Sequence, residues 1–252
     1  MIIKDKIKQY NEYEKTHPEQ LNLFSFSNIF VDKRDKYSGT VELYDVVPKY
    51  FHGDVGKVRT QDGFLKSLVR EFTYKKQKMT LRVSPAQIET EDGEKAFYPS
   101  QREEIIEDVL RKFATDRERN EFLDDRLSVR FTLYDLQKEL KKIKHTFSYN
   151  EIRESLEVLA KTNIEIKTAD GKVSFSSNMF ETLGQVDTNE DVKDSSVSEE
   201  YSKNLVYFVR FNSLVSESIK NKTWRIINYE QCMAYRKVIS RWLHKRISHM
   251  FR

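Results

Sequence analysis

The most regular pattern of apolar and polar positions lies between residues 128 and 175. Residues 128–131 alternate, which predicts a short strand. Two helices are predicted next, because apolar residues then recur at the spacing of one helical face. Their inner faces consist of Leu133, Leu136 and Leu140 in the first helix, and of Ile152, Leu156, Leu159 and Ala160 in the second. Thr132 with Asp135, and Ser148 with Glu151, have the spacing of capping boxes that begin these helices.

A β-hairpin is predicted directly after the second helix. Residues 163–167 alternate, Ala169-Asp170-Gly171 is a turn signal, and residues 172–175 form the returning strand. Another helix precedes the whole pattern; it begins at a capping box of Ser100 and Glu103 and is expected to end near Arg117. The order helix, strand, helix, turn, helix, hairpin is that of a winged helix-turn-helix.

The remaining sequence is less regular and divides into four further parts. We expect a flexible segment over residues 1–39, a β-rich subdomain over residues 40–95, and an acidic flexible loop over residues 187–203, on either side of the winged helix at 96–186. In the β-rich part, residues 40–44 alternate like a strand, and Lys75 to Lys78 is expected to form a hairpin tip. Asp92-Gly93 is a further turn signal.

Residues 204–252 are expected to form a strand followed by helices. Residues 205–211 alternate, Asn212 is placed to cap a short helix, and a long helix is predicted from Asn228 or Tyr229 to the end. We therefore expect an α+β protein: a winged helix-turn-helix with an N-terminal β-rich extension and a C-terminal basic helix that leads toward a second winged helix.

The distribution of charged residues along the chain is uneven, and it indicates what kind of partner the protein binds. The formal net charge is only +4, but residues 201–252 carry eleven Lys and Arg against Glu217 and Glu230. Residues 181–200 carry seven acids against Lys193. A basic block behind an acidic stretch is typical of a protein with one face toward a polyanion, although a solvated surface has the same composition.

Composition and motifs favour a cytoplasmic protein that is not an enzyme. The chain has no apolar run of membrane-spanning length and no signal-peptide core at its N-terminus, and its one cysteine, Cys232, is interpreted as a buried small hydrophobe. The five His residues lack metal-ligand spacing, and neither a phosphate-binding loop nor a nucleophile elbow is present. No catalytic residue, metal or cofactor is therefore expected. Glu103, Glu104, Glu107 and Asp108 are expected to form a solvated helix face.

Candidate DNA contacts come from three places. The second helix of the pair would present its first turn to base edges, and the lysines of the preceding turn and of the hairpin would contact phosphates. The last helix gathers its cations on one side, with Arg246 alone on the apolar side. The candidates are Lys141, Lys142, Lys144, His145, Tyr149, Asn150, Arg153, Lys167, Lys172, Lys237, Arg241, Lys245 and Arg246. Glu154 and Glu157 on the second helix would repel phosphates, and would equally suit a protein-interaction module.

The order of motifs from about residue 96 onward resembles bacterial plasmid replication initiator (Rep) proteins. Residues 98–113, 131–140 and 149–159 resemble their first winged helix, and residues 207–214 with 235–243 resemble the crossing into a second one. The resemblance implies a non-enzymatic initiator that binds repeated origin sequences in double-stranded DNA and recruits the host initiator and helicase. It also implies a homodimer that represses its own gene.

Two other functions remain open at the level of sequence. One is a winged-helix transcriptional repressor without a replication role. The other is an origin-nicking enzyme with a tyrosine nucleophile, which the absence of paired metal-ligand histidines disfavours.

Overall fold

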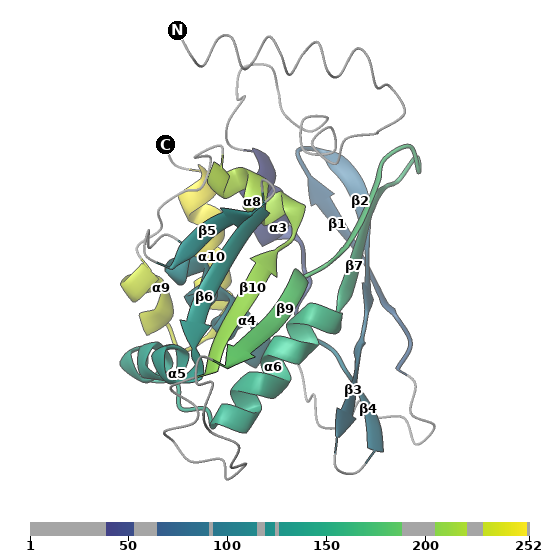
Figure 1. The fold of residues 1–252 in the computed structure, drawn as a ribbon. Helices are drawn as coiled ribbons and strands as arrows, with labels where there is room; N and C mark the ends of the chain where they lie inside the picture. The colour runs from purple at the N-terminus through teal and green to yellow at the C-terminus, as the bar shows by residue number, and fades with distance from the viewer. Residues whose placement is uncertain are drawn as a thin grey trace, which may run out of the picture.

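The described part of the computed structural model is an α+β fold with antiparallel sheets (Figure 1). It comprises residues 39–52, 65–90, 93–114, 119–123, 126–187, 205–220 and 229–250. All but the last residue of the predicted flexible segment, 1–39, and all but the first of the predicted acidic loop, 187–203, lie outside these residues. None of the described helices combines the length and the apolar character that a membrane crossing requires.

Three sheets and seven helices make up the described chain. The first sheet has the order β1 (Leu68–Tyr74), β2 (Gln77–Ser84), β7 (Asn163–Thr168), β8 (Ser174–Asn178). The second has the order β5 (Asn120–Leu123), β6 (Arg126–Thr132), β10 (Leu205–Phe211), β9 (Phe180–Asp187). A small hairpin joins β3 (Ala86–Thr90) to β4 (Gly93–Phe97). The helices are α3 (Gly39–Val46), α4 (Gln101–Phe113), α5 (Leu133–Lys142), α6 (Tyr149–Lys161), α8 (Ser213–Lys220), α9 (Tyr229–Ala234) and α10 (Val238–Met250).

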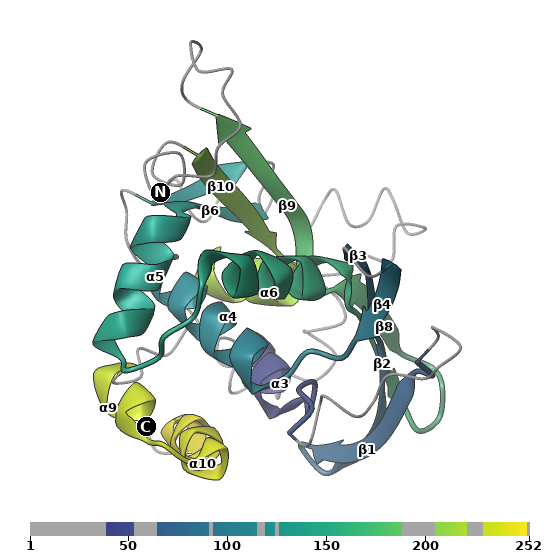
Figure 2. The same cartoon turned by 90° about the horizontal axis from the view of Figure 1, so that it is seen from below.

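The helices α4, α5 and α6 cover one face of the second sheet, as Figure 2 shows from below. The sheet faces them with the buried positions of the alternating strand β10, which are Leu205, Tyr207, Val209 and Phe211. The helices contribute Leu136, Ile152 and Leu156, and all three are fully buried in the same core, as the helical periodicity predicts.

Local signals set the beginnings of these helices. Ser148 and Glu151 form the predicted capping box of α6, and Ser100 and Glu103 form that of α4. At α5, the Thr132 side chain accepts a hydrogen bond from the Asp135 backbone N–H. The helix α4 ends at Phe113, before the predicted boundary near Arg117.

The predicted wing hairpin belongs to a different sheet from the one that carries the helices. Strand β7 pairs with β2, in the register Leu81–Ile166 and Val83–Ile164, while β6 pairs with β5 and β10. These apolar partners bury each other completely. The first sheet thus combines strands from the segments predicted as the β-rich subdomain and as the winged helix.

Two predicted elements are wrong. Residues 40–44 belong to the helix α3 and not to a strand, because Leu43, Tyr44 and Val47 are buried together on one helical side. The single long C-terminal helix is instead two helices, α9 and α10, separated by residues 235–237. Cys232 is free and fully buried, as predicted.

Truncation of Leu156 should show how much the helix–sheet core contributes to stability. We expect Leu156→Ala to lower the free energy of unfolding by about 2–5 kcal/mol, because it opens a cavity among fully buried side chains. Urea denaturation measures this change. Asn150→Ala, on the exposed side of the same helix, is the control and should stay within about 0.5 kcal/mol of the wild type.

Candidate nucleic-acid interface

The turn between α5 and α6 is held in shape by its own hydrogen bonds. The His145 N–H donates to Leu140 O at 2.9 Å, and Gln137 Nε2 donates to Phe147 O at 2.9 Å. Lys144 has a positive φ of 64°, which reverses the chain and leaves its side chain exposed. The ring of His145 stacks on Phe147, and burial together with Arg241 lowers the pKa of His145. His145 is therefore neutral near pH 7.

Of the lysines predicted for this turn, Lys141 and Lys142 are the last residues of α5 and Lys144 lies in the turn itself. Lys141, Lys142 and Lys144 are all exposed. Lys142 Nζ lies 3.0 Å from Glu139 Oε2, and Lys141 Nζ donates to the neutral Gln137 side chain at 2.9 Å. Lys141 and Lys144 therefore carry most of the charge that this turn presents to solvent.

The first turns of α6 present one of the three predicted contacts outward. Asn150 is exposed, whereas Tyr149 is half-buried against the core. Arg153 is also half-buried, and its Nε donates to Tyr207 Oη on β10 at 3.2 Å. The expectation that Arg153 projects freely from the helix is therefore wrong, because the sheet provides an acceptor for it.

The carboxylates of α6 are engaged within the protein. Glu154 accepts a hydrogen bond from Arg102 on α4, and Glu157 pairs with Lys161 at 3.4 Å. These pairs offset the negative charges of Glu154 and Glu157, which would otherwise repel DNA phosphates.

The predicted wing lysines are not brought together with this turn. Lys167 and Lys172 lie on the β7–β8 hairpin, in the first sheet. Lys167 Nζ pairs with Glu165 at 2.7 Å, and Lys172 Nζ lies 3.8 Å from Asp170. In Figure 1 this hairpin runs toward the top right, whereas α5 and α6 lie at the bottom.

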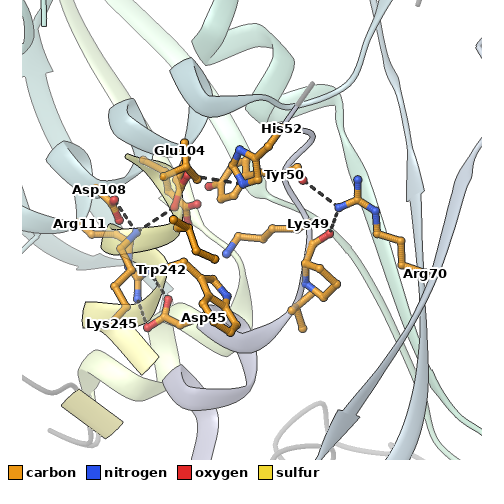
Figure 3. Close-up of a pocket in the computed structure, with 15 residues that line it drawn as sticks. Asp45, Lys49, Tyr50, His52, Arg70, Glu104, Asp108, Arg111, Trp242 and Lys245 are labelled. Atoms are coloured by element: carbon orange, nitrogen blue, oxygen red, sulfur yellow. Dashed lines mark hydrogen bonds and ion pairs between the residues drawn. The ribbon is translucent and has the colours of Figure 1, made fainter. Parts of the chain in front are cut away.

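The helix α10 lies with its cationic side against α4. Lys245 Nζ lies 2.6 Å from Asp108 Oδ2 and 3.3 Å from Glu104 Oε1 (Figure 3). Burial by itself lowers the pKa of Lys245, but the two carboxylates outweigh it and raise that pKa above its ordinary value. Burial raises the pKa of Asp108, whereas Lys245 and Arg241 hold the pKa of Glu104 below its usual range despite burial.

The expectation that Arg241 and Lys245 contact phosphates is wrong, because the chain itself covers both. Arg241 is completely buried, and none of its three guanidinium nitrogens has a hydrogen-bond partner among the described residues. Of the four cations assigned to this helix region, Lys237 is exposed, and Arg246 is half-exposed with its guanidinium 5.3 Å from the Trp242 ring centroid.

The opposite side of α10 exposes apolar side chains. Ile239 is 63% exposed and Leu243 is 47% exposed, and Trp242 and Ile247 are exposed as well. The helix is amphipathic as predicted, but its orientation is the reverse of the expected one. Because α4 offers buried carboxylates at this point, the cations of α10 turn inward.

The acidic face of α4 is the feature that sequence reasoning missed. Glu103, Glu104, Glu107 and Asp108 were expected in solvent and are all buried. Arg111 on the same helix pairs with Asp45 of α3 at 2.5 Å, and Ser155 of α6 donates to Glu103 at 2.7 Å. The available signal was a four-residue spacing shared by Glu104 and Asp108 on α4 and by Arg241 and Lys245 on α10.

A pocket of about 380 Å³ lies between α3, α4, α10 and the strand β1 (Figure 3). Its walls combine apolar residues such as Pro48 and Trp242 with the ionic groups just described. Arg70 Nη1 is engaged by the carbonyl oxygens of Pro48 and Tyr50, and Lys49 Nζ donates to Tyr44 O at 3.0 Å. Within the described ranges, no group of three His, Cys, Asp or Glu residues is arranged to hold a metal ion. The charged groups of the pocket thus serve mainly to hold α10 and α3 on α4.

Removal of the Lys245 charge should destabilise the protein strongly. We expect Lys245→Met to cost about 3 kcal/mol in the free energy of unfolding, because Glu104 and Asp108 would remain buried without their cation. Urea denaturation at pH 7 measures the loss, and Lys237→Met, at an exposed position, is the control. An equal effect of the two substitutions would contradict the assigned role.

The ion pairs of Lys245 with Glu104 and Asp108 also predict how the stability of the protein changes at alkaline pH. The pKa of Lys245 is raised in the folded state above 10.5, so its contribution is complete below that pH and is lost as the pH rises through the folded-state pKa. Unfolding followed from pH 9 to pH 12 should therefore show a steeper alkaline loss in the wild type than in Lys245→Met.

Comparisons with known proteins give a likeness in fold. No protein-family model and no curated protein matches the sequence. Among solved structures, the crystal structure of selenomethionine derivatives of domains 2 and 3 of RctB matches with a TM-score of 0.51 and 8% identity, over 84% of this chain and 71% of that chain. Another structure of the same RctB domains matches at a TM-score of 0.40 and 9% identity, over 71% and 60%. At these identities, the first match shows that the chain shares the α+β arrangement of RctB domains 2 and 3.

Proposed function

We propose that this protein is a DNA-binding replication initiator without catalytic chemistry of its own. The observation that carries the proposal is the exposed, lysine-bearing turn between α5 and α6, which lies directly before the exposed first turn of α6. The proposal is supported by the likeness in fold to domains 2 and 3 of RctB, which is a replication initiator.

The physical argument rests on the N-terminal end of α6. The major groove of B-DNA admits one α-helix, and helix-turn-helix proteins present the first residues of their second helix to base edges. Asn150 is exposed at this end, and an Asn side chain pairs with adenine through two hydrogen bonds. Lys141 and Lys144 flank it and would contact phosphates, while Glu154 and Glu157 are already neutralised by Arg102 and Lys161.

Within this proposal, α4, β6, α5 and α6 form a winged helix-turn-helix whose wing differs from the predicted one. Strand β6 lies between α4 and α5 in the sequence and pairs with β10, which in turn pairs with β9. The hairpin β9–β10 therefore occupies the place of the wing, and β7–β8 is an additional hairpin between α6 and β9.

The biological part of the proposal follows the resemblance to plasmid initiators. It assigns to the protein the recognition of repeated origin sequences, recruitment of the host initiator and helicase, a homodimeric state and repression of its own gene. A nuclease footprint on the DNA that flanks the gene tests initiation against repression. Protection of several direct repeats supports initiation, and protection of a single promoter palindrome contradicts it in favour of a repressor.

Removal of the turn lysines should weaken DNA binding in a salt-dependent way. For Lys141→Gln, Lys142→Gln and Lys144→Gln combined, we expect the slope of log K against log salt concentration to become less negative by roughly 2–3, because about 0.9 is lost per phosphate contact. Fluorescence anisotropy with a labelled duplex measures the slope. The pair Lys66→Gln and Lys95→Gln, outside the turn, is the control. An unchanged slope in the triple variant would remove the turn from the DNA-binding surface.

A further inference from the structure

The tips of two hairpins are joined into one surface at the end of the first sheet. Strands β1 and β2 are connected by Lys75 and Lys76, and β7 and β8 by the turn around Gly171. Because β2 pairs with β7, the two tips lie side by side, and the Ala169 N–H donates to Lys78 O at 3.1 Å. In Figure 1 this surface lies at the top right, at the end of the molecule opposite α5 and α6.

This surface, which we call the basic tip, gathers exposed lysines. They are Lys75, Lys76, Lys78, Lys167 and Lys172. Two nearby carboxylates are already engaged: Glu165 pairs with Lys167 and Arg82, and Asp170 accepts hydrogen bonds from Thr168 and from the Lys172 N–H. Glu71, opposite Thr80 on the same face, adds one further negative charge against the five lysines. Within the described part of the chain, neither Lys76 nor Lys78 forms an ion pair. The basic tip therefore keeps a net positive charge.

The turn of the first hairpin holds its lysines in an unfavourable backbone conformation. Lys75 has a φ of 45° and Lys76 a φ of 67°, so both lie in the left-handed region. Two-residue hairpin turns of this kind favour Asn-Gly, because those residues adopt positive φ at little cost. Residues kept in such conformations are often functional. At this turn the two residues are lysines, and they place two positive charges at the end of the hairpin.

Hydroxyl groups accompany the lysines on the outer face of the sheet. In the strand register, Thr73 is opposite Lys78, Thr80 is opposite Lys167, and Lys167 is opposite Ser174. Residues that are opposite in a sheet point to the same side, so lysine and hydroxyl groups are neighbours on this face. Lysines together with Ser and Thr hydroxyls are the usual partners of DNA phosphates.

We propose that the basic tip binds the sugar-phosphate backbone of double-stranded DNA, as a contact separate from the α5–α6 turn. The inference rests on the proposed DNA-binding function and extends it to a second surface. A lysine acts on a phosphate as a point charge, so this contact adds affinity without sequence preference. The six residues of β7 carry the tip about 20 Å beyond the end of α6, which lengthens the bound DNA segment.

The test uses a variant that improves the turn while it removes the charges. Lys75→Asn combined with Lys76→Gly suits the observed positive φ values, so the melting temperature should stay the same or rise. Binding to a labelled duplex of about 30 base pairs should weaken, and the salt slope should become less negative by roughly 2. Lys78→Gln, which keeps the turn, should change the slope by roughly 1. Lys66→Gln with Lys95→Gln removes two charges away from both proposed DNA-binding surfaces and should leave the slope unchanged.

The outcomes separate the two proposals. If the tip variants keep the wild-type slope while the α5–α6 triple variant loses part of it, the basic tip does not contact DNA and the proposed function stands. A wild-type protein that fails to bind the duplex at low salt overturns the proposed function, and the inference with it. A slope lost equally in the Lys66 and Lys95 control would show a diffuse charge effect and would also overturn the inference.

Discussion

The burial of acidic side chains on α4 is the constraint on which the rest of the described structure depends. Ten of its thirteen residues are buried, so the helix has almost no solvent-facing side to which its carboxylates could turn. A buried carboxylate is costly unless a cation or hydrogen-bond donor accompanies it. The neighbours of α4 supply these partners: Arg102 and Ser155 for Glu103, and Lys245 for Glu104 and Asp108. Ion pairs and hydrogen bonds therefore hold the neighbouring elements against α4 together with the apolar contacts.

Features that depend on neighbouring residues were predictable from the sequence. The capping box at Ser148, the strand over Leu205–Phe211 and the hairpin tip at Lys75 need only the spacing of a few side chains, and the structure confirms each of them. The helix-pair core was predictable for the same reason, since Leu136 and Ile152 mark inner faces by period alone. Alternation over residues 40–44 failed because five residues are too few to separate a strand from a buried helix.

Features that depend on distant partners were not predictable in this way. The hairpin that begins with β7 was recognised, but its partner β2 lies about eighty positions earlier, and nothing local distinguishes β2 from β6 as a neighbour. The periodicity of α10 identified a cationic side and an apolar side without indicating which of them faces the protein. For this reason Arg241 and Lys245 were predicted as DNA contacts although they are buried. Lys141, Lys144 and Asn150 are exposed, as predicted. The positive φ values of Lys75 and Lys76 become visible only in the structure.

The junction between α6 and β7 consists of one buried residue, Thr162, and it couples the helix mechanically to the hairpin. The Thr162 N–H donates to Val158 O at 2.9 Å, and its carbonyl accepts from the Met179 N–H at 3.1 Å. Asn178 Nδ2 also donates to Ala160 O at 2.9 Å, so both strands of the hairpin are tied to the last turn of the helix. The helix and the hairpin are therefore joined as one stiff unit at Thr162. A shift of α6 would be passed through this junction to the lysine-bearing tip at the other end.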